Sequence, residues 1–134
     1  MIKGKLFTDG GARGNPGPSA IGGVLYSEDK LIDSFSEYLD HGTNNQAEYQ
    51  ALIFGLNIAL KNKITELECF LDSELIVNQL NQEYKVKDKI LAKLFVKVWN
   101  LSQLFKKISF THIERSKNKE ADALVNKALD EYLK

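Results

Sequence analysis

The sequence predicts an α/β domain of the mixed α+β type, built on a five-stranded mixed sheet with helices on both faces. Residues 2–9 alternate between two faces, as a half-buried strand does, and two further strand-like runs, residues 20–27 and 31–39, follow after short turns. From residue 43 onward, apolar residues recur at helical spacing, interrupted by two short strand-like runs. With 134 residues and 43% hydrophobic residues, the chain can form one core. We therefore expect a single domain over residues 1–134, in the order β-β-β-α-β-α-α-β-α.

Three strands open the chain and are expected to form an antiparallel meander. We expect this first strand, residues 2–9, to end on Asp9, followed by flexible glycine backbone. Residues 20–27 and 31–39 predict the next two strands. Because the polar connector between them is short, these two strands are expected to form a hairpin.

The next segment predicts a helix and then a central strand. Thr43 and Gln46 fit a capping box, with Thr43 as N-cap and a helix running to about Lys61. Residues 64–72 predict the fourth strand. Its centre, Cys69 to Leu71, is apolar on both faces, so we expect helices to cover both sides of it.

The last third predicts three helices and one strand. The helices span residues 73–82, 88–105 and 118–133, and the strand spans residues 107–114. In the second of these helices, one apolar stripe consists of Ile90, Leu94, Val98 and Leu101, and Trp99 is expected to lie in the core.

Composition excludes several classes of protein. The chain has no run of about 18 apolar residues, so the sequence predicts no membrane span. The first residues also lack the apolar stretch of a secretory signal. The single cysteine, Cys69, excludes an internal disulfide and a cysteine-based metal site, and suits the cytoplasm. The net charge is zero, yet residues 28–48 are strongly acidic and residues 81–107 are strongly basic. These segments are either two solvated faces or, for the basic one, a phosphate-binding surface.

Four carboxylates occupy positions that folding alone does not require. Asp9 and Asp72 end predicted strands, and each shares its strand face with a phenylalanine two residues earlier. Glu48 and Asp122 each begin an apolar stripe in the first turns of a predicted helix. Ligands bind outside the ends of strands in sheets covered by helices, so the four acids are candidates for one site.

Buried carboxylates that lie close together need a compensating positive charge. The helix dipole, worth about 0.3–1 kcal/mol, offers a purely structural explanation for Glu48 or Asp122 alone, but not for Asp9 and Asp72. A bound cation explains all four. Because the ligands are oxygens, Mg²⁺ is favoured, with Mn²⁺ as a substitute. Two such ions about 3.5–4 Å apart could clamp the attacking and leaving oxygens of a phosphodiester.

Four motifs carry a resemblance to a known family. They are TDGGARGNPGP, TNNQAEYQAL, FLDSELIV and NKEADALVNKA, at residues 8–18, 43–52, 70–77 and 118–128. With their spacing, the chain resembles type 1 ribonuclease H, in the short form of archaeal and bacterial members. The resemblance implies a ribonuclease H-like fold. It also implies an endonuclease that cuts the RNA strand of RNA–DNA hybrids and leaves 3′-hydroxyl and 5′-phosphate ends. Two Mg²⁺ ions would act with substrate, and we expect a monomer without an obligate protein partner.

The resemblance also assigns roles to residues. It places the catalytic and metal-binding acids at Asp9, Glu48, Asp72 and Asp122. It places contacts to the minor groove of the hybrid at Gly10, Gly11, Ala12, Asn15, Asn44, Asn45 and Gln46. Asparagine can both donate to and accept from a 2′-hydroxyl, but Asn44 and Asn45 equally suit the start of a helix, and both roles can hold together.

The chain departs from many members of this family in two places. Where those members carry a histidine in a mobile loop, this chain has a short loop with Arg115, which is better placed to contact a phosphate, while His112 falls in a strand and is interpreted as structural. The long basic, tryptophan-rich protrusion of some members is replaced by a short segment. In that segment, Lys85 and Lys87 form either a reduced phosphate-binding channel or a solvated turn.

Three other functions remain in competition. Another nuclease of the same superfamily would share the acids, but the TNN sequence before Glu48 and the lack of accessory domains count against it. A non-catalytic module that only binds hybrid would be expected to lose an acid. A structural domain stabilised by a cation would not need the lysine-rich segment at residues 81–107.

Overall fold

The computed structural model describes residues 2–133, so the outermost residues of the expected 1–134 domain lie outside it. Five strands form one mixed sheet in the order β3-β2-β1-β4-β5. The strands are β1 (Lys3–Ala12), β2 (Gly17–Ser27), β3 (Lys30–Gly42), β4 (Glu66–Leu71) and β5 (Lys107–His112). β1, β2 and β3 pair antiparallel, while β4 pairs parallel to both β1 and β5. The predicted fold class and antiparallel meander are confirmed.

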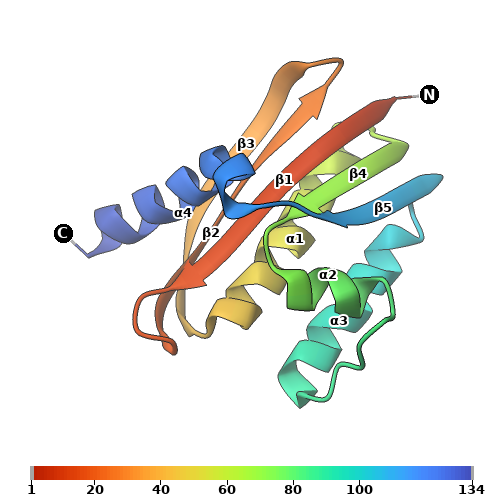
Figure 1. The fold of residues 1–134 in the computed structure, drawn as a ribbon. Coiled ribbons are helices and arrows are strands. Elements are labelled where there is room, and N and C mark those ends of the chain that lie inside the picture. The colour runs from red at the N-terminus through yellow and green to blue at the C-terminus, as the bar shows by residue number, and fades with distance from the viewer. Residues whose placement is uncertain (1, 134) are drawn as a thin grey trace.

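Helices cover the two faces of the sheet unequally (Figure 1). The helices are α1 (Asn44–Lys61), α2 (Glu74–Leu80), α3 (Lys89–Ser102) and α4 (Lys119–Tyr132). α1, α2 and α3 lie on one face, and α4 lies across β1, β2 and β3 on the other. The main core lies between the sheet and the helices α1, α2 and α3. A smaller cluster of Ala20, Val125, Ala128 and Leu129 lies beneath α4.

Helix α1 begins and ends where the sequence predicts. Thr43 accepts a hydrogen bond from the backbone N–H of Gln46, and the Gln46 side chain accepts one from the N–H of Thr43, which completes the predicted capping box. The helix then runs to Lys61, as expected. This cap satisfies N–H groups that the first turn of a helix cannot pair internally, and it fixes where the acid-bearing turn of α1 begins.

The first strand is longer than predicted, and the expected end at Asp9 is wrong. β1 continues to Ala12, with Asp9 opposite Gly22 of β2 and Gly10 opposite Ile21. Its pairing with β4 stops at Phe7–Phe70, however. Asp9 therefore lies in regular strand but just past the end of β4, where the sheet opens on that side.

Three expectations about burial are also wrong. In β4, Glu68 is exposed and Phe70 is half-buried, because α4 does not extend over this part of the sheet. Trp99 is 45% exposed and Ile90 is 55% exposed. Both belong to α3, which packs mainly on α1 and leaves its far side to solvent. A 3₁₀ turn, Arg115–Lys117, also precedes α4 without having been predicted.

Candidate active site

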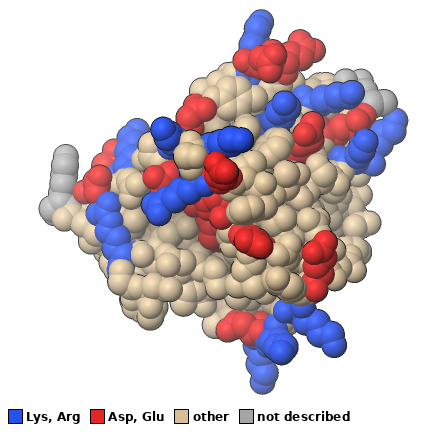
Figure 2. Space-filling model, in the orientation of Figure 1, with Lys and Arg blue, Asp and Glu red and all other residues tan. Residues whose placement is uncertain are grey.

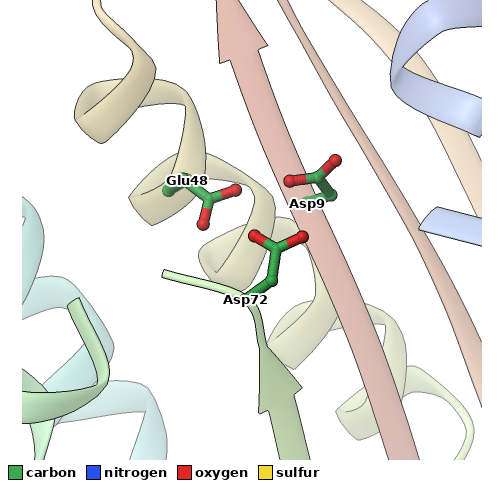
Figure 3. Close-up of side chains that lie close together, drawn as sticks. All are labelled: Asp9, Glu48 and Asp72. Atoms are coloured by element: carbon green, nitrogen blue, oxygen red, sulfur yellow. The ribbon is translucent and has the colours of Figure 1, made fainter. Parts of the chain in front are cut away.

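The four predicted acids come together from both faces of the sheet. Asp9 lies on β1, Asp72 follows the last residue of β4, Glu48 is in the second turn of α1 and Asp122 is in the first turn of α4. Carboxylate oxygens of Asp9, Glu48 and Asp72 lie within 4.8 Å of one another. Figure 3 shows these three side chains pointing toward a common point. Asp122 lines the same cleft of about 480 Å³.

Glycine allows α1 to approach the sheet closely enough for Glu48 to reach Asp9. A Cβ on Gly10 would lie 2.3 Å from the backbone of Ala47 and 2.6 Å from the backbone nitrogen of Glu48. The N–H of Gly10 donates to Glu48 Oε1 at 2.6 Å. The predicted flexibility of this glycine is therefore not its role, since Gly10 is paired in β1 and provides space for a helix.

A second glycine plays the same part on the other face. A Cβ on Gly22 would lie 2.7 Å from the carbonyl oxygen of Ala121 and 2.8 Å from the backbone nitrogen of Val125. Gly22 is the cross-strand partner of Asp9. The close approach of α4 at this point brings Asp122 to the cleft. The sequence carried a signal for this contact in the Gly22–Gly23 pair of the second strand, which the sequence reading did not use.

Burial and mutual repulsion change the acidity of two of the acids. Burial, together with the charges of Asp72 and Asp122, raises the pKa of Asp9 to about 7, although a hydrogen bond with Glu48 acts in the opposite direction. Burial raises the pKa of Glu48 well above its usual value, and the neighbouring Asp9 adds to the effect. Without a cation, this pair therefore retains a proton near neutral pH.

The donor set fits a hard divalent cation. Glu48 is only 6% exposed, and among residues 2–133 no group hydrogen-bonds its Oε2 atom. A buried carboxylate oxygen without a partner is costly unless a positive charge faces it. Oxygen ligands without histidine or cysteine are those that Mg²⁺ and Mn²⁺ prefer. The residues present can thus hold a divalent ion at the centre of the cleft.

The asparagines that the resemblance assigns to the hybrid serve first to build the cleft wall. Asn15 accepts from the backbone N–H of Asn44 at 3.0 Å, and Asn44 accepts from the N–H of Ala12 at 2.7 Å. These bonds join the β1–β2 turn to the start of α1. Asn45 lines the cleft, and Gln46 is engaged in the helix cap. Gly11 and Ala12 lie on the same wall.

Basic and acidic side chains are interspersed on the face shown in Figure 2. Arg115 is exposed, with one guanidinium nitrogen 3.5 Å from Asp122 Oδ1, and it lines the cleft. His112 is exposed at the end of β5. Lys85 and Lys87 are exposed on the loop between α2 and α3 and do not line this cleft.

Several residues of the cleft were not predicted from the sequence. Ser73, Val125, Asn126 and Leu129 also line it. The buried Asn118 touches Asp72 with its amide group. Its position, four residues before Asp122 at the predicted start of a helix, was the available signal.

Comparisons with known proteins agree with this fold and this cleft. A family described as "Reverse transcriptase-like" matches residues 7–128. The solved ribonuclease H1 of Halobacterium salinarum is 38% identical, with a TM-score of 0.94 over 96% of this chain and 98% of that one. The chain belongs to the ribonuclease H family.

Other members of the ribonuclease H family show the same likeness. A ribonuclease H1 isolated from compost has been solved in complex with an RNA/DNA hybrid. It is 42% identical to this chain, which covers 99% of it, with a TM-score of 0.91. The bifunctional protein Rv2228c of Mycobacterium tuberculosis is 40% identical over 127 residues. This chain spans 35% of that protein and 63% of the curated ribonuclease HI of Halobacterium salinarum.

Proposed function

We propose that this chain is an endonuclease that hydrolyses the RNA strand of RNA–DNA hybrids with the help of divalent ions, leaving 3′-hydroxyl and 5′-phosphate ends. The observation that carries the proposal is the meeting of Asp9, Glu48 and Asp72 within 4.8 Å, from three different elements. The likeness to a ribonuclease H1 solved with an RNA/DNA hybrid supports the choice of substrate.

The acids have distinct tasks in this proposal. The pKa of Asp9 is affected by all three other acids, through a hydrogen bond with Glu48 and the charges of Asp72 and Asp122, so Asp9 is assigned the central ligand position. Glu48 supplies its unpaired oxygen, and Asp72 and Asp122 complete the ligand set. Divalent ions bound here would activate a water molecule and neutralise charge on the leaving 3′-oxygen. The Asp9–Glu48 pair must release its shared proton for the ligands to act.

The cleft wall is proposed to read the hybrid through its minor groove. Gly10, Gly11 and Ala12 present backbone close to the acids, and Asn45 faces the same cleft. Asn15, Asn44 and Gln46 hold the wall in shape through the hydrogen bonds described above, and the exposed atoms of their amides remain available to 2′-hydroxyls. Arg115 is assigned a phosphate contact beside Asp122. Lys85 and Lys87 are proposed as more distant phosphate contacts.

Further parts of the proposal concern the state of the protein. Mg²⁺ is proposed as the working metal, with Mn²⁺ as a substitute, because all candidate ligands are carboxylate oxygens. A monomeric single domain over residues 1–134 in the cytoplasm is proposed, and the one free, buried cysteine suits a reducing compartment. No helix among residues 2–133 is long and apolar enough to cross a membrane.

A cleavage assay tests the proposal. Labelled RNA–DNA hybrid, double-stranded RNA and single-stranded RNA are each incubated with Mg²⁺, Mn²⁺ or EDTA. We expect the RNA strand of the hybrid to be cut with either metal, and no cleavage with EDTA or in the Asp72→Asn variant. Full activity of Asp72→Asn would refute the site. Hybrid binding without cleavage under every metal condition would instead support a non-catalytic binding module.

A further inference from the structure

Asn118 is a buried polar residue at the back of the acidic cleft. It lies between the 3₁₀ turn Arg115–Lys117 and α4, and only 1% of its surface is exposed. Side chains on either side of it in sequence, Lys117 and Lys119, are exposed. A polar side chain that is fully buried in an otherwise solvated segment needs a physical reason, because burying an amide is costly unless it is hydrogen-bonded.

The amide group of Asn118 donates toward two of the strands that carry the acids. Its Nδ2 atom donates to the carbonyl oxygen of Thr8 at 2.9 Å, and it makes a longer hydrogen bond of 3.4 Å to Asp72 Oδ2. Thr8 immediately precedes Asp9 on β1. The backbone carbonyl of Asn118 accepts from the N–H of Asp122 at 3.1 Å. One residue therefore connects the backbone beside Asp9, the carboxylate of Asp72 and the turn that carries Asp122.

Two observations narrow the role of this side chain to its NH₂ group. Asparagine before a helix usually caps it, but within the described residues the side chain of Asn118 makes no capping bond to α4. In the same part of the chain, the buried Oδ1 atom of Asn118 has no hydrogen-bond partner. An unpaired buried acceptor costs about 1–3 kcal/mol, and an apolar side chain of the same shape would avoid that cost. The useful part of this amide is thus its NH₂ group, which faces Thr8 and Asp72.

We propose that Asn118 is a positioning residue that holds the Asp72 carboxylate in the orientation that binds the divalent ion. The inference rests on the proposed function, since it needs Asp72 as a metal ligand. The bond from Asn118 to Asp72 Oδ2 would limit rotation of a carboxylate that lies within 4.8 Å of those of Asp9 and Glu48. Partners that orient a metal ligand in this way typically contribute about 10–100-fold to metal affinity or activity.

Two variants and one matched control test this role. Asn118→Leu keeps the approximate shape of the side chain and removes both the donor and the unpaired acceptor, while Asn118→Ala removes the side chain beyond Cβ. Asn62→Ala is the control. The Nδ2 atom of Asn62 also donates two bonds, at 3.0 Å to Asp33 Oδ2 and at 2.9 Å to the carbonyl oxygen of Ile58, but it lies at the C-terminal end of α1, outside the cleft.

Three quantities are measured for each protein: the melting temperature without metal, the dissociation constant of Mg²⁺ by titration calorimetry, and kcat and KM on hybrid. For Asn118→Leu we expect Mg²⁺ to bind about 10–100-fold more weakly and kcat at fixed Mg²⁺ to fall to a similar extent, with KM changed less than about twofold. Its melting temperature is also expected to fall, because the carbonyl oxygen of Thr8 loses a buried 2.9 Å bond, so the test rests on Mg²⁺ affinity and kcat. The control should bind Mg²⁺ as the wild type does.

The inference is overturned if Asn118→Leu binds Mg²⁺ and turns over like Asn62→Ala while the wild type cleaves hybrid. If the wild type itself does not cleave, the proposed function has failed instead. A measurement without any variant guards against misfolding. In ¹⁵N-labelled wild-type protein, the side-chain amide resonance of Asn118 should shift as Mg²⁺ is added, and that of Asn62 should not. An unmoved Asn118 resonance at saturating Mg²⁺ would equally overturn the inference.

Discussion

Replacing Asp9 with asparagine is expected to stabilise the metal-free protein above neutral pH while abolishing cleavage. In the wild type, burial and neighbouring carboxylates raise the pKa of Asp9 from 3.8 to about 7. Each unit of pKa shift corresponds to about 1.4 kcal/mol, so ionising this side chain in the folded state costs at most about 4 kcal/mol. Asparagine has nearly the same shape and no charge to bury. Because part of the cost is shared with Glu48, we expect a gain of about 2–4 kcal/mol at pH 8.

The sign of the effect follows from which state holds the proton. Between about pH 4 and pH 7, the folded chain keeps a proton on Asp9 that the unfolded chain releases. The contribution of this group to stability is therefore complete below pH 4, declines as pH rises and is lost above about pH 7. The advantage of Asp9→Asn should be large at pH 8 and small at pH 4.5.

Thermal unfolding in EDTA at both pH values measures this difference. For a chain of this length, about 1 kcal/mol corresponds to about 4 °C, so the variant should melt about 8–16 °C higher than wild type at pH 8. The control is Asp130→Asn, which removes an exposed ion pair with Arg13 and should shift the melting temperature little at either pH. A variant that melts below wild type at pH 8, or gains equally at both pH values, would refute the burial of charge inferred at Asp9.

Three further results are expected. Mg²⁺ affinity measured by titration calorimetry should rise from pH 6 to pH 8, with proton release, because ligand binding displaces the proton retained by the Asp9–Glu48 pair; a flat pH profile would contradict this. Gly10→Ala should lower the melting temperature markedly and abolish cleavage, since its Cβ would lie 2.3 Å from the backbone of α1; unaltered melting would be inconsistent with the close approach. Tyr49→Phe should lower the free energy of unfolding in denaturant by about 1–2 kcal/mol, because it removes a buried 2.7 Å hydrogen bond to Gln79. Cleavage should be unaffected, since neither side chain has a part in the proposed reaction; a loss of kcat would contradict this.

Much of the fold was predictable because its signals are local. The capping box at Thr43 and Gln46 depends on residues three apart, and the alternation of the first strand depends on neighbours two apart. The acids at helix starts were predictable for the same reason, as polar exceptions in apolar stripes. Strand ends were less predictable, because the end of a strand depends on its partner. β1 passes Asp9 and reaches Ala12 only because β2 continues beside it.

Exposure was the least predictable property. An apolar stripe predicts that a helix packs against the core, but not how much of the helix surface its neighbours bury. Trp99 and Ile90 look like core residues in the sequence, yet α3 packs mainly on α1 and leaves them partly in solvent. Similarly, the centre of β4 is apolar on both faces, which predicts that Phe70 is buried. The position of α4 shows that the sheet is covered there on one side only.

The sequence by itself determined the order of elements, the helix cap and the identity of four acids that folding did not require. Only the tertiary structure decided that Asp9, Glu48 and Asp72 meet within 4.8 Å, that Gly10 and Gly22 provide space for the two helices beside them, and that Asn118 faces Asp72. The physical reason is distance along the chain. Secondary structure is set by neighbours a few residues apart, whereas a site built from β1, α1, β4 and α4 exists only once packing has brought these elements together.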